Sequence, residues 1–221
     1  MEINNKIIKH YLKNVYFING TAYAGKSTMV ARLAEKYGMI QCQENYHFSV
    51  TGQLATPEEY PNICYFEIMK DWQEFLNRSP EEYERWIKDT TAELIEFEIA
   101  ELMHISKSQN VIVDTNIPVE VLKEIADYHQ VAIMLSPQAM SVDRFFDRGD
   151  LDKQFLLSQI QQAKDPEQTM KNFRACIERI NSKESYEKFK SSGFFTIVRE
   201  NNESDTREKT LEALAKHFGL E

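Results

Sequence analysis

Five short apolar segments alternate along the chain with longer segments of helical periodicity. The apolar segments are rich in β-branched and aromatic residues, whereas between them hydrophobic residues recur every three or four positions. The predicted strands are residues 15–19, 39–43, 111–114, 131–135 and 194–198. Segments this apolar are typical of strands buried on both faces. The pattern therefore predicts an α/β fold with a five-stranded, mostly parallel sheet.

Proline follows a capping residue at four positions, and each pair predicts the start of a helix. Proline lacks an N–H group, which costs nothing at the first helical position, and the residue before it can accept hydrogen bonds from the first turn. The four pairs are Thr56-Pro57, Ser79-Pro80, Ser136-Pro137 and Asp165-Pro166. Asp205, three residues before Glu208, predicts a fifth start. Residues 55–106 hold two long helical patterns and no strand, so we expect them to form a helical insert within a single domain of residues 1–221.

The charge balance argues against a nucleic-acid or membrane partner. Lys and Arg number 26 and Asp and Glu 35, a net charge of −9, whereas neutralising phosphates needs a basic excess. The longest apolar runs, such as residues 131–135, fall far short of the ~20 residues of a membrane span. With 42% hydrophobic residues the composition is that of a globular protein.

The N-terminus and the cysteines favour a cytoplasmic location. Residues 1–6 contain an early acid and no apolar stretch of the kind that a secretory signal requires. Cys42, Cys64 and Cys176 are scattered, odd in number and without a Cys-x-x-Cys pair. This usage predicts a reducing compartment, with neither a disulfide framework nor a zinc site.

One glycine pair carries a specific chemical signal. The segment Gly20-Thr-Ala-Tyr-Ala-Gly-Lys-Ser-Thr28 lies between the first predicted strand and a helical pattern, and it fits the Walker A spacing G-x-x-x-x-G-K-S. In such a loop the N–H groups and the helix N-terminus face phosphates, Lys26 reaches the β- and γ-phosphates, and Ser27 ligates Mg²⁺. The alternative is a glycine turn with an incidental lysine. The predicted nucleotide-binding residues are Gly20, Ala22, Tyr23, Ala24, Gly25, Lys26, Ser27 and Thr28.

With this loop the chain resembles the P-loop NTPases, and missing motifs narrow the resemblance. The sequence has no Asp-x-x-Gly or Asn-Lys-x-Asp of GTPases and no Leu-Ser-Gly-Gly-Gln of transporter ATPases. The strand ending at Asp114 is followed by Thr115-Asn116, not by the Glu of hydrolytic motors. What remains is similar to the adenylate kinase, shikimate kinase and nucleoside kinase group. The resemblance implies a three-layer P-loop sandwich that uses ATP and Mg²⁺ to phosphorylate a small molecule.

The resemblance also implies roles for two carboxylates. In this group the segment after the second strand holds the acceptor, here with Glu44 as base or anchor and His47 as second choice. The alternative for Glu44 is a solvated loop acid, and for His47 a packing or surface histidine. Asp114 ends an apolar strand, where it would hold Mg²⁺ with Ser27, or else cap the helix that opens at Pro118.

Arginines after the fourth strand suit a lid. Arg144 and Arg148 share one helix face, and residues 137–190 are expected to form a lid and the helices that follow it. The resemblance implies that arginines in such a lid stabilise the transferring phosphoryl group. Salt bridges with nearby aspartates are the alternative, and Arg174 is a weaker candidate. The predicted catalytic residues are Lys26, Glu44, Asp114, Arg144 and Arg148.

All of the net charge lies in the insert. Residues 57–102 contain 13 acids and 4 bases, and the remainder is neutral. One interpretation is that these acids lie on solvated helix faces. The other is that they select a neutral or cationic small-molecule acceptor over an anionic one. Aromatic residues in the insert form a core or line the acceptor pocket. A competing function is an ATP-binding regulatory or interaction protein with slow or no hydrolysis.

Overall fold

Strands and helices alternate along most of the chain, as the sequence predicts. The computed structural model describes residues 5–44, 46–137, 140, 142, 145–146, 151–199 and 205–221. The strands are β1 (Val15–Gly20), β2 (Ile40–Cys42), β3 (Val111–Asp114), β4 (Val131–Leu135) and β5 (Phe195–Val198). The helices are α1 (Asn5–Tyr11), α2 (Lys26–Tyr37), α3 (Phe48–Leu54), α4 (Tyr65–Ile68), α5 (Trp72–Leu76), α6 (Pro80–Ile105), α7 (Val119–Ile125), the 3₁₀ turn η1 (Tyr128–Gln130), α9 (Leu151–Gln161), α10 (Pro166–Ile180), α11 (Lys183–Lys190) and α12 (Arg207–Phe218).

The five strands form one open sheet in the order β2-β3-β1-β4-β5, and every neighbouring pair is parallel. The predicted α/β class and parallel sheet are confirmed, and the strand bounds agree to within one residue. The agreement is close because the central strands are buried along their whole length; every residue of β3 and β4 is buried. Apart from Asp114 at the end of β3, all residues of these two strands are apolar, so the strands stand out in the sequence.

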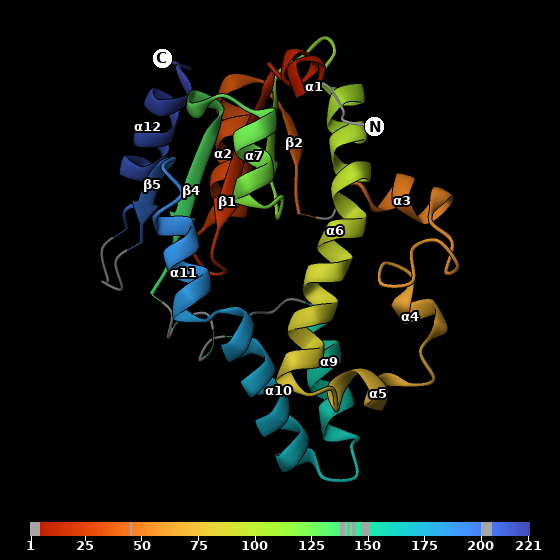
Figure 1. The fold of residues 1–221 in the computed structure, drawn as a ribbon. Helices are drawn as coiled ribbons and strands as arrows, with labels where there is room; N and C mark the ends of the chain where they lie inside the picture. The colour runs from red at the N-terminus through yellow and green to blue at the C-terminus, as the bar shows by residue number, and fades with distance from the viewer. Residues whose placement is uncertain are drawn as a thin grey trace.

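Helices cover both faces of the sheet (Figure 1). On one face, residues of α2 and α12 such as Leu33 and Leu214 pack on the sheet. On the other face, residues of α1, α7 and α11 pack around Phe17 and Val113. β1 and β3 are neighbours in the sheet. The chain continues from β1 into α2 on one face of the sheet and from β3 into α7 on the opposite face. In open parallel sheets a ligand crevice forms at this kind of divergence, beyond the carboxyl ends of the strands.

A second core lies away from the sheet and joins two segments that are distant in the sequence. We call the helices around it the helical lobe: α4, α5, the first half of α6, α9 and α10 (Figure 1). Its core includes Tyr83 of α6 and Phe173 of α10, and the insert aromatics Tyr65 and Phe75 pack there. α6, roughly 40 Å long, runs from this lobe to the sheet, where Leu102 is buried. Helices of the insert and helices after β4 therefore share one core.

Two of the predicted helix starts have the expected caps, and one is wrong. Ser79 forms a capping box with Glu82, and the Asp165 side chain accepts a hydrogen bond from the Gln168 N–H. No helix starts at Thr56, where the chain makes only a turn. The reason is a second proline, Pro61, which stops a helix begun at residue 57. The insert, residues 55–106, therefore holds one long helix, α6, and two short ones, α4 and α5, rather than two long ones.

The remaining two predicted helix starts are those at Asp205 and at Ser136-Pro137. α12 begins at Arg207 with Thr206 as the residue before it, and Asp205 instead accepts the Arg207 N–H and pairs with its guanidinium. After Ser136-Pro137 the structure describes only parts of the chain up to Leu151.

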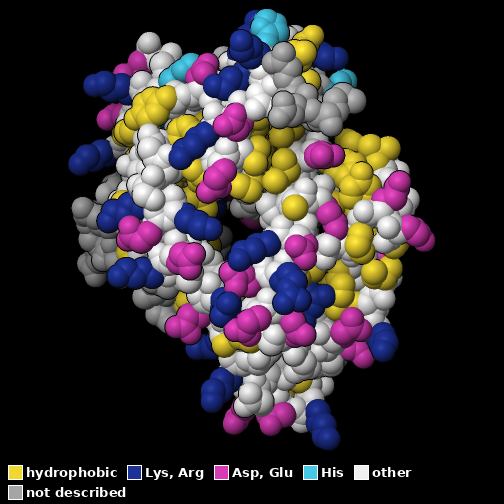
Figure 2. Space-filling view, viewed as in Figure 1, with side chains coloured by type: hydrophobic (Ala, Val, Ile, Leu, Met, Phe, Trp, Pro, Cys, Tyr) yellow, Lys and Arg dark blue, Asp and Glu magenta, His cyan; other side chains and the backbone are white. Residues whose placement is uncertain are grey.

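Figure 2 shows apolar side chains gathered over α3 and α4, where Phe48, Leu54, Phe66 and Ile68 are exposed. No helix within the described ranges is both long and apolar enough to cross a membrane.

We expect Gly20→Ala to destabilise the protein by about 3 kcal/mol or more. Gly20 has φ +130°, and a Cβ there would lie 1.9 Å from the Met134 carbonyl oxygen of the neighbouring strand. Urea unfolding measures the loss. The matched control is Gly219→Ala, since Gly219 also has a positive φ but open space around it, so that substitution should cost only about 1 kcal/mol. Equal losses in the two variants would contradict the close packing of β1 against β4.

Candidate functional site

The glycine loop, residues 20–28, leaves the centre of the sheet and turns directly into α2. Three of its residues have a positive φ: Gly20 with 130°, Tyr23 with 64° and Gly25 with 91°. Gly25 is the residue before α2 and has no side chain to cap it. The first N–H groups of a helix have no partner within the helix, and they carry the positive end of its dipole. The loop therefore ends in a set of donors suited to an anion.

Polar contacts hold the first half of the glycine loop to three neighbouring segments. The Asn19 side chain accepts from the Gly20 N–H at 2.6 Å and donates to the Ile117 carbonyl at 2.7 Å. Ser136, at the end of β4, donates from Oγ to the Ala22 carbonyl at 2.6 Å. Arg199, after β5, donates from Nη1 to the Tyr23 carbonyl at 2.7 Å. These contacts fix the conformation of the loop.

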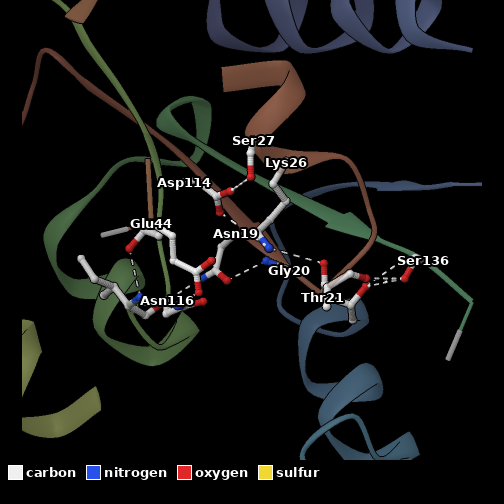
Figure 3. A network of polar contacts seen from close by, with 12 residues as sticks. Asn19, Gly20, Thr21, Lys26, Ser27, Glu44, Asp114, Asn116 and Ser136 are labelled. Carbon is white, nitrogen blue, oxygen red and sulfur yellow. Dashed lines mark hydrogen bonds and ion pairs between the residues drawn. The ribbon is translucent and has the colours of Figure 1, made fainter. Parts of the chain in front are cut away.

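Lys26 and Ser27, where the glycine loop becomes α2, lie beside Asp114 (Figure 3). Ser27 Oγ donates to Asp114 Oδ2 at 2.7 Å, and Lys26 Nζ lies 3.6 Å from Asp114 Oδ1. Asp114 is 1% exposed, and no described residue donates a hydrogen bond to its Oδ1. Burial raises the pKa of Asp114 above its ordinary value, while Lys26 and the Ser27 hydrogen bond act in the opposite direction. Asp114 does not cap α7, whose preceding residue is Pro118.

Three consecutive residues at the end of β3 each contact a different element. Asp114 accepts from Ser27 of α2, Thr115 Oγ1 donates to Glu98 Oε1 of α6 at 2.6 Å, and Asn116 Nδ2 donates to Glu44 Oε1 after β2 at 2.6 Å. Thr115 Oγ1 also accepts from the Ile117 N–H at 3.0 Å. The end of β3 therefore connects the glycine loop with two further carboxylates.

Those two carboxylates line a small cavity of about 60 Å³. Its walls are Glu44, His47, Thr91, Leu94, Glu98 and Asn116. Glu44 is exposed, whereas Glu98 is 5% exposed. His47 is 3% exposed, and neither ring nitrogen has a hydrogen-bond partner among the described residues. Burial lowers the pKa of His47, with Glu44 opposing, which favours a neutral ring.

Glu98 is a site residue that sequence reasoning missed. Burial raises its pKa to about 7; Glu44 and Asp114 add to this, and the hydrogen bond from Thr115 opposes it. In the sequence it is one of many acids on a long helix. One signal was available: Leu94 and Leu102 lie four residues before and after it, so this acid lies on the apolar face of the helix.

We expect Glu98→Gln to stabilise the folded protein by about 3 kcal/mol at pH 8 and by less than about 1 kcal/mol at pH 5. The folded-state pKa of Glu98 lies above the ordinary value of 4.5, so the folded protein binds a proton that the unfolded chain releases. Stability is therefore lost as the pH rises from about 4.5 to about 7, and the amide, which does not ionise, avoids this loss. Urea unfolding at both pH values measures it; a variant less stable at pH 8 than the parent would contradict the burial of an ionised Glu98.

The predicted lid arginines, Arg144 and Arg148, lie outside the described residues. Arg174 is exposed on α10. The segment after β4 does bring one cation to the glycine loop, since Lys153 Nζ of α9 lies 5.6 Å from the centre of the Tyr23 ring. Neither Lys153 nor Arg199 was predicted, because each is an ordinary basic residue in the sequence and only the folded chain brings it to the loop.

The comparisons with known proteins add no relative. No protein-family model matches the sequence, and no curated protein matches it closely enough to count as a relative. What the site can do must therefore be argued from the chemistry of its own residues: a loop of N–H donors, a lysine, a hydroxyl beside a buried carboxylate, and an acidic cavity.

Proposed function

We propose that this protein transfers the γ-phosphoryl group of ATP, with Mg²⁺, to a hydroxyl group of a small molecule. One observation carries the proposal. Lys26 and Ser27, the first residues of a helix that follows a glycine loop, both face the buried carboxylate of Asp114. A cation, a hydroxyl and a carboxylate at the N-terminus of a helix are the groups that binding a metal-complexed triphosphate requires.

The triphosphate would lie against the glycine loop. Donors at the start of α2 would take the phosphate oxygens, and Lys26 would move from Asp114 and from the Thr21 carbonyl, 3.4 Å away, to the β- and γ-phosphates. The positive φ of Gly25 lets the backbone turn so that its N–H groups face inward. The contacts of Asn19, Ser136 and Arg199 would keep this arrangement fixed before the nucleotide binds.

The residues present fit Mg²⁺. Ser27 Oγ and Asp114 supply oxygen ligands, and Mg²⁺ prefers oxygen and usually keeps several water molecules. Asp114 Oδ1 is buried and accepts no hydrogen bond from the described residues, so a cation would offset an otherwise costly carboxylate. The ion, when bound, neutralises charge on the phosphate oxygens as the phosphoryl group moves.

The cavity beside Asn116 would hold the acceptor. It lies beyond the carboxyl ends of β2 and β3, and its lining residue Asn116 is two residues after Asp114. Figure 2 shows that this face of the molecule is hollowed between the sheet and α6. Glu44 at the exposed side is available to anchor the acceptor, as the sequence predicts. Arg144 and Arg148 would stabilise the transferring group from the lid; this role stays a prediction.

Consumption of ATP with and without an acceptor separates this function from its competitors. The protein is incubated with Mg²⁺ and ATP, alone and with pooled small metabolites from a cell extract freed of protein and nucleotides. A kinase consumes ATP at least about tenfold faster with the pool, because its acceptor completes the site. ATP binding without consumption in either case would favour a regulatory nucleotide-binding protein. Equally fast consumption without the pool would indicate a hydrolase.

A further inference from the structure

The cavity contains two carboxylates. The sequence suggests Glu44 for catalysis, but Glu98 is the more deeply buried of the two. Glu98 reaches the cavity from α6, while Glu44 is exposed at its other side. Thr115, the residue directly after Asp114, donates to Glu98 Oε1, and the described residues give no hydrogen bond to Oε2. The backbone of Glu98 is held as well, since Tyr46 Oη donates to its carbonyl at 3.0 Å.

We propose that Glu98 is the residue that accepts the proton of the acceptor hydroxyl, and that the cavity selects hydroxyl compounds without negative charge. The proposal rests on the phosphoryl transfer proposed above. Glu98 suits the role because one oxygen is fixed by Thr115 while the other is left for a ligand. Thr115, which donates to Glu98, also directly follows Asp114, the carboxylate at which we place Mg²⁺.

His47 is an independent sign that the cavity receives a polar ligand. Its ring is 3% exposed, and both nitrogens lack a hydrogen-bond partner within the described part of the chain. A buried polar group without a partner costs free energy, so such groups are normally paired with protein, water or ligand. The cavity beside the ring provides the space for that partner.

The walls of the cavity determine the charge of the ligand. They carry two carboxylates, an imidazole, an amide and a hydroxyl, and no Lys or Arg is among the six lining residues. An anionic acceptor would meet Glu44 and Glu98 with no Lys or Arg among the described lining residues to offset them, whereas hydroxyl or ammonium groups can donate to both. The acceptor is therefore an uncharged or cationic alcohol.

The step balances without a further reactant. The O–H bond of the acceptor breaks and its proton passes to a carboxylate oxygen of Glu98. The acceptor oxygen forms a bond to the γ-phosphorus of ATP, the bond from that phosphorus to the β,γ-bridging oxygen breaks, and the electron pair leaves with ADP. Burial raises the pKa of Glu98 to about 7, which suits a group that must take up and release a proton near neutrality.

The test compares three carboxylate-to-amide variants with Mg²⁺ and γ-labelled ATP. Water serves as one acceptor; choline, glycerol and adenosine serve as uncharged or cationic acceptors; glycerate and AMP serve as anionic ones. Glu98→Gln should lower kcat at least about 100-fold without changing the Kd for ATP. Glu44→Gln should mainly raise KM. Glu96→Gln, an exposed position on the same helix, should match the parent.

Each outcome is decisive for one claim. If Glu98→Gln keeps the kcat of the parent, the role of Glu98 is wrong, and if an anionic acceptor is used faster than the uncharged and cationic ones, the selectivity is wrong. In both cases the proposed phosphoryl transfer stands. If the parent protein does not consume ATP, the proposed function itself fails. Thermal unfolding of Glu98→Gln checks the fold, which should be at least as stable as that of the parent.

Discussion

Lys26→Ala should lower ATP turnover by about 10³-fold or more while the protein stays folded. Lys26 forms an ion pair with Asp114, and its side chain is only 11% exposed. In the proposed reaction it moves to the phosphates and stabilises the charge that accumulates on them. The variant removes that charge, whereas the glycine loop keeps its contacts with Asn19 and Ser136. Steady-state turnover and calorimetric titration with ATP measure the two effects.

The matched control is Lys36→Ala, on the exposed side of the same helix. It changes the same net charge far from the glycine loop and should leave turnover within about twofold of the parent. Thermal unfolding shows whether Lys26→Ala stays folded. A folded Lys26→Ala protein with normal turnover would show that the glycine loop is not the site of phosphoryl transfer.

Asp114→Asn should abolish most of the Mg²⁺ dependence and lower turnover by about 10² to 10³-fold. The amide can still accept the Ser27 hydrogen bond, but it carries no charge for a cation, and Lys26 loses its counter-charge. ATP should then bind equally well with and without Mg²⁺, whereas the parent should bind the Mg²⁺ complex more tightly. Titrations in EDTA and in Mg²⁺ measure this difference.

The control for this substitution is Asp89→Asn, an exposed carboxylate on α6. It should bind and turn over MgATP as the parent does. If Asp114→Asn retains Mg²⁺-dependent turnover, then Asp114 serves only to position Ser27 and Lys26, and the metal must bind elsewhere.

The sheet could be predicted from the sequence because its strands carry their own signal. Residues 111–113 and 131–135 are buried on both faces and apolar at every position, and Asp114 ends the first of these strands, so the strand bounds coincide with the predicted ones. The turn at residues 57–63 could not be predicted from Thr56-Pro57 alone. Glu93, which is about 30 residues further on, accepts the N–H groups of Asn62 and Ile63, so a distant side chain stabilises this turn.

The same distinction applies to the candidate site. Lys26 and Ser27 were identifiable because their order after two glycines is specific, and the structure places both beside Asp114. Glu98 could not be identified as a site residue in the same way. Its spacing from Leu94 and Leu102 indicates only that it lies on the apolar face of α6, and its place in the cavity depends on where α6 crosses the ends of the strands. The sequence predicts the insert and the lid as separate parts. In the structure α6 of the insert and α10 after β4 share one core, in which residues about 90 positions apart in the sequence pack together.

The fate of the γ-phosphate decides whether this protein transfers a phosphoryl group to a small molecule. ATP labelled with ¹⁸O on the γ-phosphate is incubated with the protein, Mg²⁺ and the pooled metabolites, and the products are analysed by mass spectrometry. We predict that a labelled phosphoryl group appears on a small hydroxyl compound, and that Lys26→Ala prevents this. Label found only in inorganic phosphate, or retained entirely in ATP, would contradict phosphoryl transfer at this site.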